Sequence, residues 1–291
     1  MVDARESKPT ANVVSSAKLH KNSPKASGND IFKAMMSGTA VKRPASSQAS
    51  DTKKRKPKPL PATYAHLPLL PDAISDGLLV LFVGLNPGLE TARSGHAYAH
   101  PTNHFWRLLF SSGITPRACR PEEDGKMPEL YSLGLTNIVS RPSRNGAELS
   151  KQEMDDGVAL LHEKARKWRP ESMCIVGKSI WESIWRVRHG KLPGKNFKYG
   201  WQDTSENMGV IRGEWKGARV FVATTTSALA KNMSMEDKQE IWDKLGSWVM
   251  ARRIAREKDK VEAKEGAEAE AALKKDLPTD LSSVNSDDTT T

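Results

Sequence analysis

Three short, continuously apolar runs mark the middle of the chain, and each one ends in glycine or threonine. They read GLLVLFVG at 77–84, SMCIVG at 172–177 and ARVFVATT at 218–225. Short apolar runs that end in a turn are typical of strands buried on both faces of a parallel sheet. A further strand is predicted around GLTNIV at 134–139.

Segments with helical spacing separate these predicted strands. The segment 150–168 opens with a capping box from Ser150 to Glu153 and continues with amphipathic spacing, which predicts a helix. The same spacing predicts further helices within 103–113, 178–185 and 235–256. Because strands and helices alternate, we expect an α/β fold, a three-layer α/β/α domain with a central, mostly parallel sheet.

The two ends of the chain lack this pattern. Residues 1–62 are rich in Ser, Lys, Pro, Ala and Asn and contain few large apolar side chains, so they cannot bury enough surface to offset the entropy of ordering. We therefore predict a disordered basic arm at 1–62 and a folded domain at 63–255. Residues 256–291 are predicted to form a helical extension that leads into a disordered tail.

Most of the positive charge lies in the arm. The formal net charge of the chain is +10, and residues 1–60 carry 13 Lys and Arg against 4 Asp and Glu. Such an arm favours an acidic polyelectrolyte, because neutralising phosphates releases counterions; nucleic acid is the first candidate and an anionic membrane the second. KKRKPKP at 53–59 indicates a nuclear-localisation signal, which we prefer, or a nonspecific DNA-binding patch. NDIFKAMMSG at 29–38 either folds on a partner or is a chance apolar cluster.

Hydropathy and cysteine content suggest the compartment. No run of about 18 apolar residues occurs, and the N-terminus lacks the apolar region of a secretory signal. Cys119 and Cys174 are the only cysteines, too few for a disulfide framework or a cysteine-based zinc site. We expect a soluble, intracellular protein of a reducing compartment with no membrane partner.

Segments that resemble familiar cofactor and metal-binding motifs do not have the residue spacing that these motifs require. VGKS at 176–179 lacks the glycine that a phosphate-binding loop needs five residues before its last glycine, and GLNPG at 84–88 lacks the glycines of a dinucleotide fingerprint. The histidines of segment 95–104 recur every four residues, but a glycine and a proline interrupt any helix that would carry them. We therefore expect no metal, no cofactor and no covalent nucleophile.

An unusual set of polar groups remains at the predicted strand ends. Asn86 and Asn137 each follow a strand, a threonine-rich turn follows another at 223–232, and Tyr98 lies in a loop rich in Gly, Pro and His. The carboxyl ends of parallel strands meet at one edge, so these groups should converge. Amides and hydroxyls can hydrogen-bond a nucleobase, and a tyrosine ring can stack on one. The alternative is that the segment 86–88, Asn-Pro-Gly, is merely a turn.

The longer segments around these residues resemble the mismatch-specific uracil/thymine DNA glycosylases, a branch of the uracil-DNA glycosylase superfamily. The likeness lies in GLNPG followed by SGHAYAHPTNHFWRLLFSSGITP, and it continues through GLTNIVSRPS, LSKQEMDDG, VGK and VFVATTTSALA. It covers about residues 67–248 and omits both ends. It implies that 63–255 is a glycosylase catalytic domain.

The resemblance also implies an activity. Such an enzyme flips a mismatched or damaged base out of double-stranded DNA, hydrolyses its N-glycosidic bond and leaves an abasic site for base-excision repair. The expected substrates are uracil or thymine opposite guanine, and modified cytosines; the expected protein is a nuclear monomer without a cofactor, with repair proteins as partners through its tails. No lysine occupies a predicted nucleophile position, so no lyase activity is expected. The alternatives are a non-catalytic DNA-binding module on the same fold and an RNA- or nucleotide-processing enzyme.

Individual roles follow from the resemblance by position. Asn86 places the attacking water, Tyr98 stacks on the flipped base, Asn137 contacts the base edge, and Leu229 fills the space that the base vacates. Ser143 lies where the family has a pocket threonine. The base pocket is thereby assigned to Leu85, Thr91, Tyr98, Asn137 and Ser143. The DNA-binding and wedge residues are Thr225, Thr226, Ser227, Ala228, Leu229, Lys178 and Lys231.

An asparagine in place of a carboxylate predicts slow catalysis. The amide positions water without accepting its proton, and general-base help is worth roughly 10²- to 10⁴-fold. The turn that begins at Ala223 also departs from the family's Asn-Pro-Ser or Met-Pro-Ser opening, and Leu229 cannot hydrogen-bond an orphaned guanine. Thr91 and Ala97 replace pocket residues that vary across the family and so bear on the preference among uracil, thymine and modified cytosines. Uracil opposite guanine is the first substrate expected.

Overall fold

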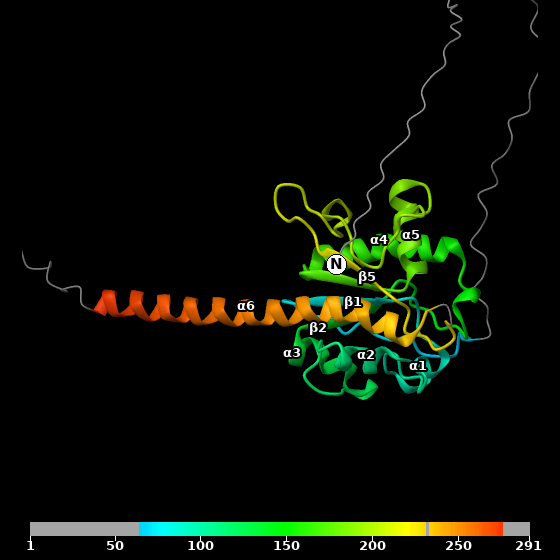
Figure 1. Cartoon of the computed structure of the whole chain (residues 1–291), viewed down its shortest axis with the longest axis horizontal. Helices are drawn as coiled ribbons and strands as arrows, with labels where there is room; N and C mark the ends of the chain where they lie inside the picture. Colours follow the sequence, from blue (N-terminus) through cyan, green and yellow to red (C-terminus); the bar gives the residue numbers. More distant parts are fainter. Residues whose placement is uncertain (1–63, 231–232, 276–291) are drawn as a thin grey trace, which may run out of the picture. The chain divides into compact units, whose positions relative to one another are not determined.

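A single five-stranded sheet forms the centre of the protein. The computed structural model describes residues 64–230 and 233–275. The strands are β1 (Val80–Gly84), β2 (Leu133–Asn137), β3 (Ser172–Val176), β4 (Gly200–Trp201) and β5 (Arg219–Ala223). They lie in the order β2-β1-β3-β5-β4, and all neighbours are parallel except β4 and β5. This confirms the predicted central, mostly parallel sheet (Figure 1).

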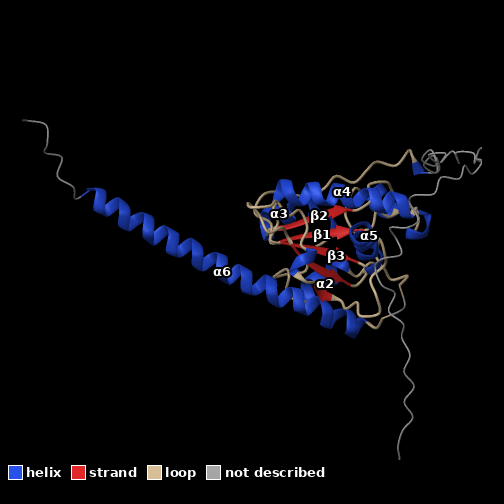
Figure 2. Ribbon diagram, turned by 90° about the horizontal axis from the view of Figure 1, so that it is seen from above, coloured by secondary structure: helices blue, strands red, loops and turns tan. Residues whose placement is uncertain are grey.

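Helices cover both faces of the sheet (Figure 2). The helices are α1 (Leu89–Ser94), α2 (Phe105–Ser111), α3 (Met127–Tyr131), α4 (Lys151–Trp168), α5 (Lys178–His189) and α6 (Met235–Lys275). Neighbouring strand residues alternate between the two cores. Phe82 packs with Phe105 and Trp242, from α2 and α6, whereas Val83 belongs to the other core, with Trp181 of α5 and residues of α4. The three layers agree with the predicted fold class.

The hydrophobic pattern identified the long elements and missed the short ones. The four predicted strands coincide with β1, β2, β3 and β5. The capping box is confirmed as well, because Ser150 Oγ accepts the Glu153 N–H while the Glu153 carboxylate accepts the Ser150 N–H. The hydrophobic pattern did not predict α1, α3 and β4, which have six, five and two residues. Elements this short contain too few residues to show a period.

Helix α6 has a packed part and an exposed part. Trp242 and Leu245 are fully buried, and Arg252 and Arg256 both pair with Glu171 at the amino end of β3. The described side chains beyond these residues are exposed. The predicted boundary between 255 and 256 lies inside this helix, whereas the predicted arm lies outside the described residues. None of the helices in the described ranges combines the length and hydropathy needed to cross a bilayer.

Candidate active site

A cleft of about 840 Å³ opens at the carboxyl edge of the sheet. The cleft is lined by the segment 84–88, which begins with the last residue of β1, by Asn137 at the end of β2 and by the segment 225–230 after β5. This confirms that the polar groups at the strand ends come together, as parallel strand topology requires. In the ranges that the structure describes, no group of three or more His, Cys, Asp and Glu side chains is placed to hold a metal.

Most of the predicted site residues line this cleft. They are Leu85, Asn86, Thr91, Tyr98, Asn137, Thr225, Thr226, Ser227, Ala228 and Leu229. Ser143 lies behind Asn86 and not in the lining. Lys178 is exposed outside the cleft, with its ammonium 3.7 Å from the Glu182 carboxylate and 5.2 Å from the centre of the Phe197 ring. Lys231 lies outside the described residues.

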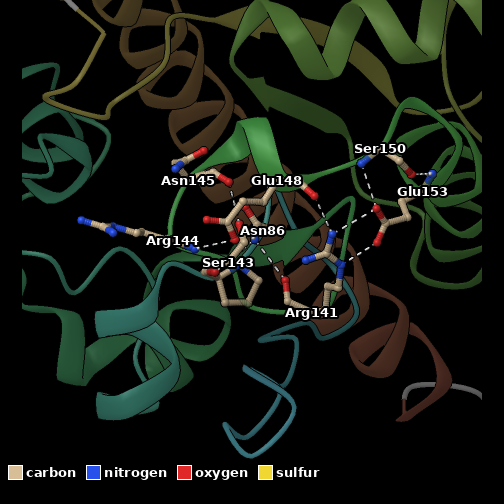
Figure 3. Close-up of polar contacts among 9 residues, drawn as sticks. Asn86, Arg141, Ser143, Arg144, Asn145, Glu148, Ser150 and Glu153 are labelled. Carbon is tan, nitrogen blue, oxygen red and sulfur yellow. Dashed lines mark hydrogen bonds and ion pairs between the residues drawn. The ribbon is translucent and has the colours of Figure 1, made fainter. Parts of the chain in front are cut away.

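The side-chain amide of Asn86 has three acceptors around its nitrogen (Figure 3). Nδ2 lies 2.8 Å from Ser143 Oγ, 3.0 Å from the Arg141 carbonyl oxygen and 3.2 Å from the Pro87 carbonyl oxygen, so its two hydrogens are shared among three acceptors. The Ser143 hydroxyl donates in turn to the Asn145 carbonyl oxygen at 2.9 Å, so the serine oxygen acts as an acceptor toward Asn86. Segment 138–143 also donates three backbone hydrogen bonds, of 2.9, 3.0 and 3.1 Å, to segment 84–88.

This network determines which way the amide faces. Two partners of Nδ2 are carbonyl oxygens, which can only accept hydrogen bonds. A flipped amide would place Oδ1 against both of them, and the hydrogen bonds to these carbonyls would be lost. The orientation therefore leaves Oδ1 of Asn86 as the acceptor available to the cleft, and no donor in the described part of the chain bonds it.

Tyr98 and Asn137 meet beside Gly84, on the floor of the cleft. A Cβ at Gly84 would lie 2.5 Å from Asn137 Oδ1 and 2.8 Å from Tyr98 Oη, so both side chains reach this point because the residue is glycine. The Tyr98 ring stacks on Phe105, with ring centroids 3.8 Å apart, and its backbone is left-handed, with φ of 54°. The Tyr98 hydroxyl is buried without a hydrogen-bond partner among the described residues. Burial, and then the nearby Cys174, raises the pKa of Tyr98 far above its usual value, so the phenol stays neutral.

Asp124 holds one wall of the cleft, although nothing in the sequence pattern singled it out. Its carboxylate accepts the Ala97 N–H at 2.6 Å and contacts His96 Nδ1 at 3.1 Å, and its side chain is only 13% exposed. The residue belongs to the polar stretch PEEDGK at 121–126, far along the chain from the wall that it supports. Local spacing therefore contains no signal that could have identified it.

The loop after β5, residues 225–229, forms the opposite side of the cleft and is called here the wedge loop. Its internal hydrogen bonds are long: Ser227 N–H to Thr225 Oγ1 at 3.4 Å and Leu229 N–H to Ser227 Oγ at 3.3 Å. The His104 N–H donates to the Thr226 carbonyl oxygen at 2.9 Å and ties the loop to the rest of the domain. Leu229 is 81% exposed, more than any other large hydrophobic residue in the described part of the chain.

Comparison with known proteins identifies the family. The family model described as the uracil DNA glycosylase superfamily matches residues 71–246, a region that contains the whole sheet and every residue of the cleft lining except Leu70. A Schizosaccharomyces pombe protein named G/U mismatch-specific uracil DNA glycosylase is 38% identical over 177 residues, which cover 60% of this chain and 51% of that protein. The match thus spans about half the length of this relative. With the family model matching more than half of its length, the chain belongs to the uracil DNA glycosylase superfamily.

Proposed function

We propose that this protein is a monofunctional DNA glycosylase that flips uracil opposite guanine out of double-stranded DNA and hydrolyses its N-glycosidic bond. The product is an abasic site for base-excision repair. The observation that carries this proposal is the Asn86 amide, whose Nδ2 is fixed and whose Oδ1 is free at the cleft. Membership of the superfamily supports the type of reaction, and the name of the S. pombe relative supports a G/U mismatch as the substrate.

The proposed reaction requires a water molecule held in one orientation. The water oxygen attacks C1′ of the deoxyribose while the bond from C1′ to the base nitrogen breaks. The base leaves with the bonding electrons, and the proton lost by the water passes to solvent. Asn86 Oδ1 accepts a hydrogen bond from this water and orients it, but an amide cannot take the proton. Catalysis therefore depends on orientation and on hydrogen bonds to the departing base.

The floor of the cleft is suited to the base. The Tyr98 ring, backed by Phe105, offers a stacking surface, and the Asn137 amide can both donate to and accept from a base edge. Thr91, which is buried in the same cleft, is placed to influence the choice between uracil, thymine and modified cytosines. Uracil is our first choice because the name of the S. pombe relative supports a G/U mismatch, and because a water that receives no general-base help from the Asn86 amide requires a good leaving group.

Selection of mismatches would come from base flipping. Extruding a base costs a few kcal/mol, and the cost is lowest for a base that is already mispaired. Leu229 is exposed beside the cleft, so it can enter the duplex and fill the space that the base leaves. Lacking a polar group, it cannot recognise the opposite guanine by hydrogen bonds.

We also propose that the protein acts as a nuclear monomer, with repair proteins binding to its tails. The basic cluster at 53–59 supports nuclear import, and the charge of residues 1–60 supports nonspecific DNA affinity. Removing residues 1–60 should then weaken DNA binding mainly at low salt and flatten its salt dependence. If the salt dependence of DNA binding is unchanged after this removal, residues 1–60 act only as an import signal.

A duplex with one G·U mismatch tests the activity. The protein is incubated with the duplex, and half of each sample is treated with alkali to cleave abasic sites. We expect strand cleavage after alkali and an intact strand without it, because no lyase step is proposed. If alkali reveals no cleavage while a known glycosylase of the family cleaves the same duplex, the proposal is wrong, and a purely DNA-binding role becomes the explanation.

A further inference from the structure

The Arg141 carbonyl is one of the three acceptors that hold Asn86, and the side chain of the same residue is anchored elsewhere. Its guanidinium Nε lies 2.5 Å from Glu153 Oε1, and Nη2 lies 3.1 Å from Oε2 and 2.9 Å from the Glu148 carbonyl oxygen. Figure 3 shows this chain of contacts running from Asn86 through Arg141 to Glu153. Two parallel bonds to a carboxylate define the position of a guanidinium better than one bond can.

Glu153 is itself held in place at the start of α4. Its backbone N–H donates to Ser150 Oγ at 3.1 Å, and its carboxylate accepts the Ser150 N–H at 2.8 Å. The hydrogen bonds from Arg141 lower the pKa of Glu153 to about 2, so the carboxylate is ionised at any neutral pH. The side chains of Arg141 and Glu153 are 13% and 30% exposed, which limits screening by solvent. The first turn of an 18-residue helix thus anchors the loop that carries the acceptors of Asn86.

We propose that the ion pair between Arg141 and Glu153 is a positioning device for Asn86 in base excision. The inference rests on the proposed function. Residues 140–145 form no helix or strand and pair with 84–88 only through the bridge between Ser143 and Gly88, so the path of the chain at Arg141 depends on such anchors. Both the Arg141 carbonyl and the Ser143 hydroxyl belong to this segment, and displacing them releases the amide. A displacement of about 1 Å at a reacting group can cost roughly 10²-fold in rate.

A second ion pair on the same helix serves as a matched control. Arg186 of α5 contacts Asp155 of α4, with nitrogen to oxygen distances of 2.5 and 3.2 Å. Its side chains are 24% and 26% exposed, similar to those of the first pair. This pair ties α4 to α5 and does not involve the cleft lining or segment 138–149. A general loss of stability should therefore affect both pairs alike, whereas a loss of positioning should affect only the first.

Single-turnover excision of uracil from a G·U duplex gives the first readout, measured beside the dissociation constant for the same duplex. We expect Arg141→Ala to lower the excision rate constant roughly 10- to 100-fold while the dissociation constant stays within about twofold. Glu153→Gln keeps the shape but loses the charge, so it should give a smaller loss in the same direction. Arg186→Ala should excise at the wild-type rate within about twofold.

The side-chain amide of Asn86 gives a second readout that needs no activity. Its ¹⁵N–¹H signals are assigned by their absence in Asn86→Ala, and their exchange with solvent is measured. We expect slow exchange in the wild type and in Arg186→Ala, and at least about tenfold faster exchange in Arg141→Ala, because the hydrogen bonds that Nδ2 donates protect its protons.

The outcomes separate the two proposals. An active wild type whose Arg141→Ala variant excises equally fast, or equal amide exchange in both proteins, overturns the positioning role alone. Equal losses in Arg141→Ala and Arg186→Ala also overturn it, because they indicate general destabilisation. A wild type without excision overturns the proposed function instead, and faster amide exchange in Arg141→Ala would then still support the anchoring of Asn86.

Discussion

Two loops border the cleft, and they are held in opposite ways. The segment 84–88 lies against 138–143 through backbone hydrogen bonds of 2.9 to 3.1 Å, and the nitrogen of its Asn86 has three acceptors. The wedge loop has internal hydrogen bonds of 3.3 and 3.4 Å and exposes Leu229. The first loop is fixed from outside itself at several points, whereas the wedge loop is tied to the rest of the domain by the hydrogen bond from the His104 N–H to the Thr226 carbonyl oxygen, at 2.9 Å.

This difference matches two separate tasks. Orienting a water for attack requires a geometry that is set before the substrate arrives, because reorganisation during the reaction raises the barrier. Filling a gap in a base stack requires apolar volume, and an exposed side chain can adjust to the duplex. We therefore infer that bond cleavage depends on the segment 84–88 and that the lifetime of the flipped state depends on the wedge loop.

Asn86→Ala should have the largest effect, because it removes the group that we propose to orient the water. We expect the single-turnover excision rate on a G·U duplex to fall by about 10²-fold or more, with the dissociation constant of the duplex nearly unchanged. Asn196→Ala, at an exposed asparagine outside the cleft, is the control and should excise normally. Excision near the wild-type rate in Asn86→Ala would show that this amide does not position the water.

Gly84→Ala should have the next largest effect. The new methyl group would lie 2.5 Å from Asn137 Oδ1 and 2.8 Å from Tyr98 Oη, so both side chains would have to move from the floor of the cleft. We expect roughly a tenfold or greater loss of excision rate, measured under single-turnover conditions. Gly125→Ala is the matched control, because a Cβ there has no atom within 4 Å. Equal excision rates in Gly84→Ala and Gly125→Ala would show that Tyr98 and Asn137 do not contribute to the base site.

The sequence predicted the sheet and the meeting of its strand ends, because short apolar runs and parallel topology leave few alternatives. Asn86 and Asn137 could therefore be placed at one edge without a structure. The anchor of Asn86 could not be predicted, since the bond to the Arg141 carbonyl spans 55 residues and depends on the path of a loop without periodicity. Ser143 illustrates the same limit: the resemblance places it in the base pocket, whereas the structure places it outside the cleft lining, with its hydroxyl oxygen accepting a hydrogen bond from Asn86 Nδ2.

Leu229→Ala tests the wedge loop, with a smaller expected effect. The residue is highly exposed, so its truncation should leave the melting temperature unchanged. We expect a loss of about three- to tenfold in excision from a G·U duplex and a larger loss from an A·U duplex, whose base pair is costlier to open. Val210→Ala, another exposed apolar residue, controls for surface effects. Equal losses on both duplexes would argue against a role in base flipping.

Glu153→Gln should have the smallest effect, on stability in acid. The Arg141 hydrogen bonds lower the pKa of Glu153 to about 2, whereas a glutamate in an unfolded chain titrates near pH 4.3. The ionised pair therefore stabilises the fold fully above about pH 5, and this contribution is lost as the pH falls from about 4.3 toward 2. A partly exposed pair is worth about 0.5 to 1 kcal/mol, so the variant should melt ~2 °C below the wild type at pH 7.

The difference in melting temperature should shrink steadily below about pH 4, because the wild-type carboxylate then becomes neutral as well. Glu163→Gln, at an exposed position of the same helix, reports the effect of removing one charge from α4 without touching the anchor. If the melting difference for Glu153→Gln is as large at pH 2 as at pH 7, the carboxylate does not act through its charge on Arg141. It then acts through the hydrogen bond that it accepts from the Ser150 N–H, which the glutamine side chain can replace only in part.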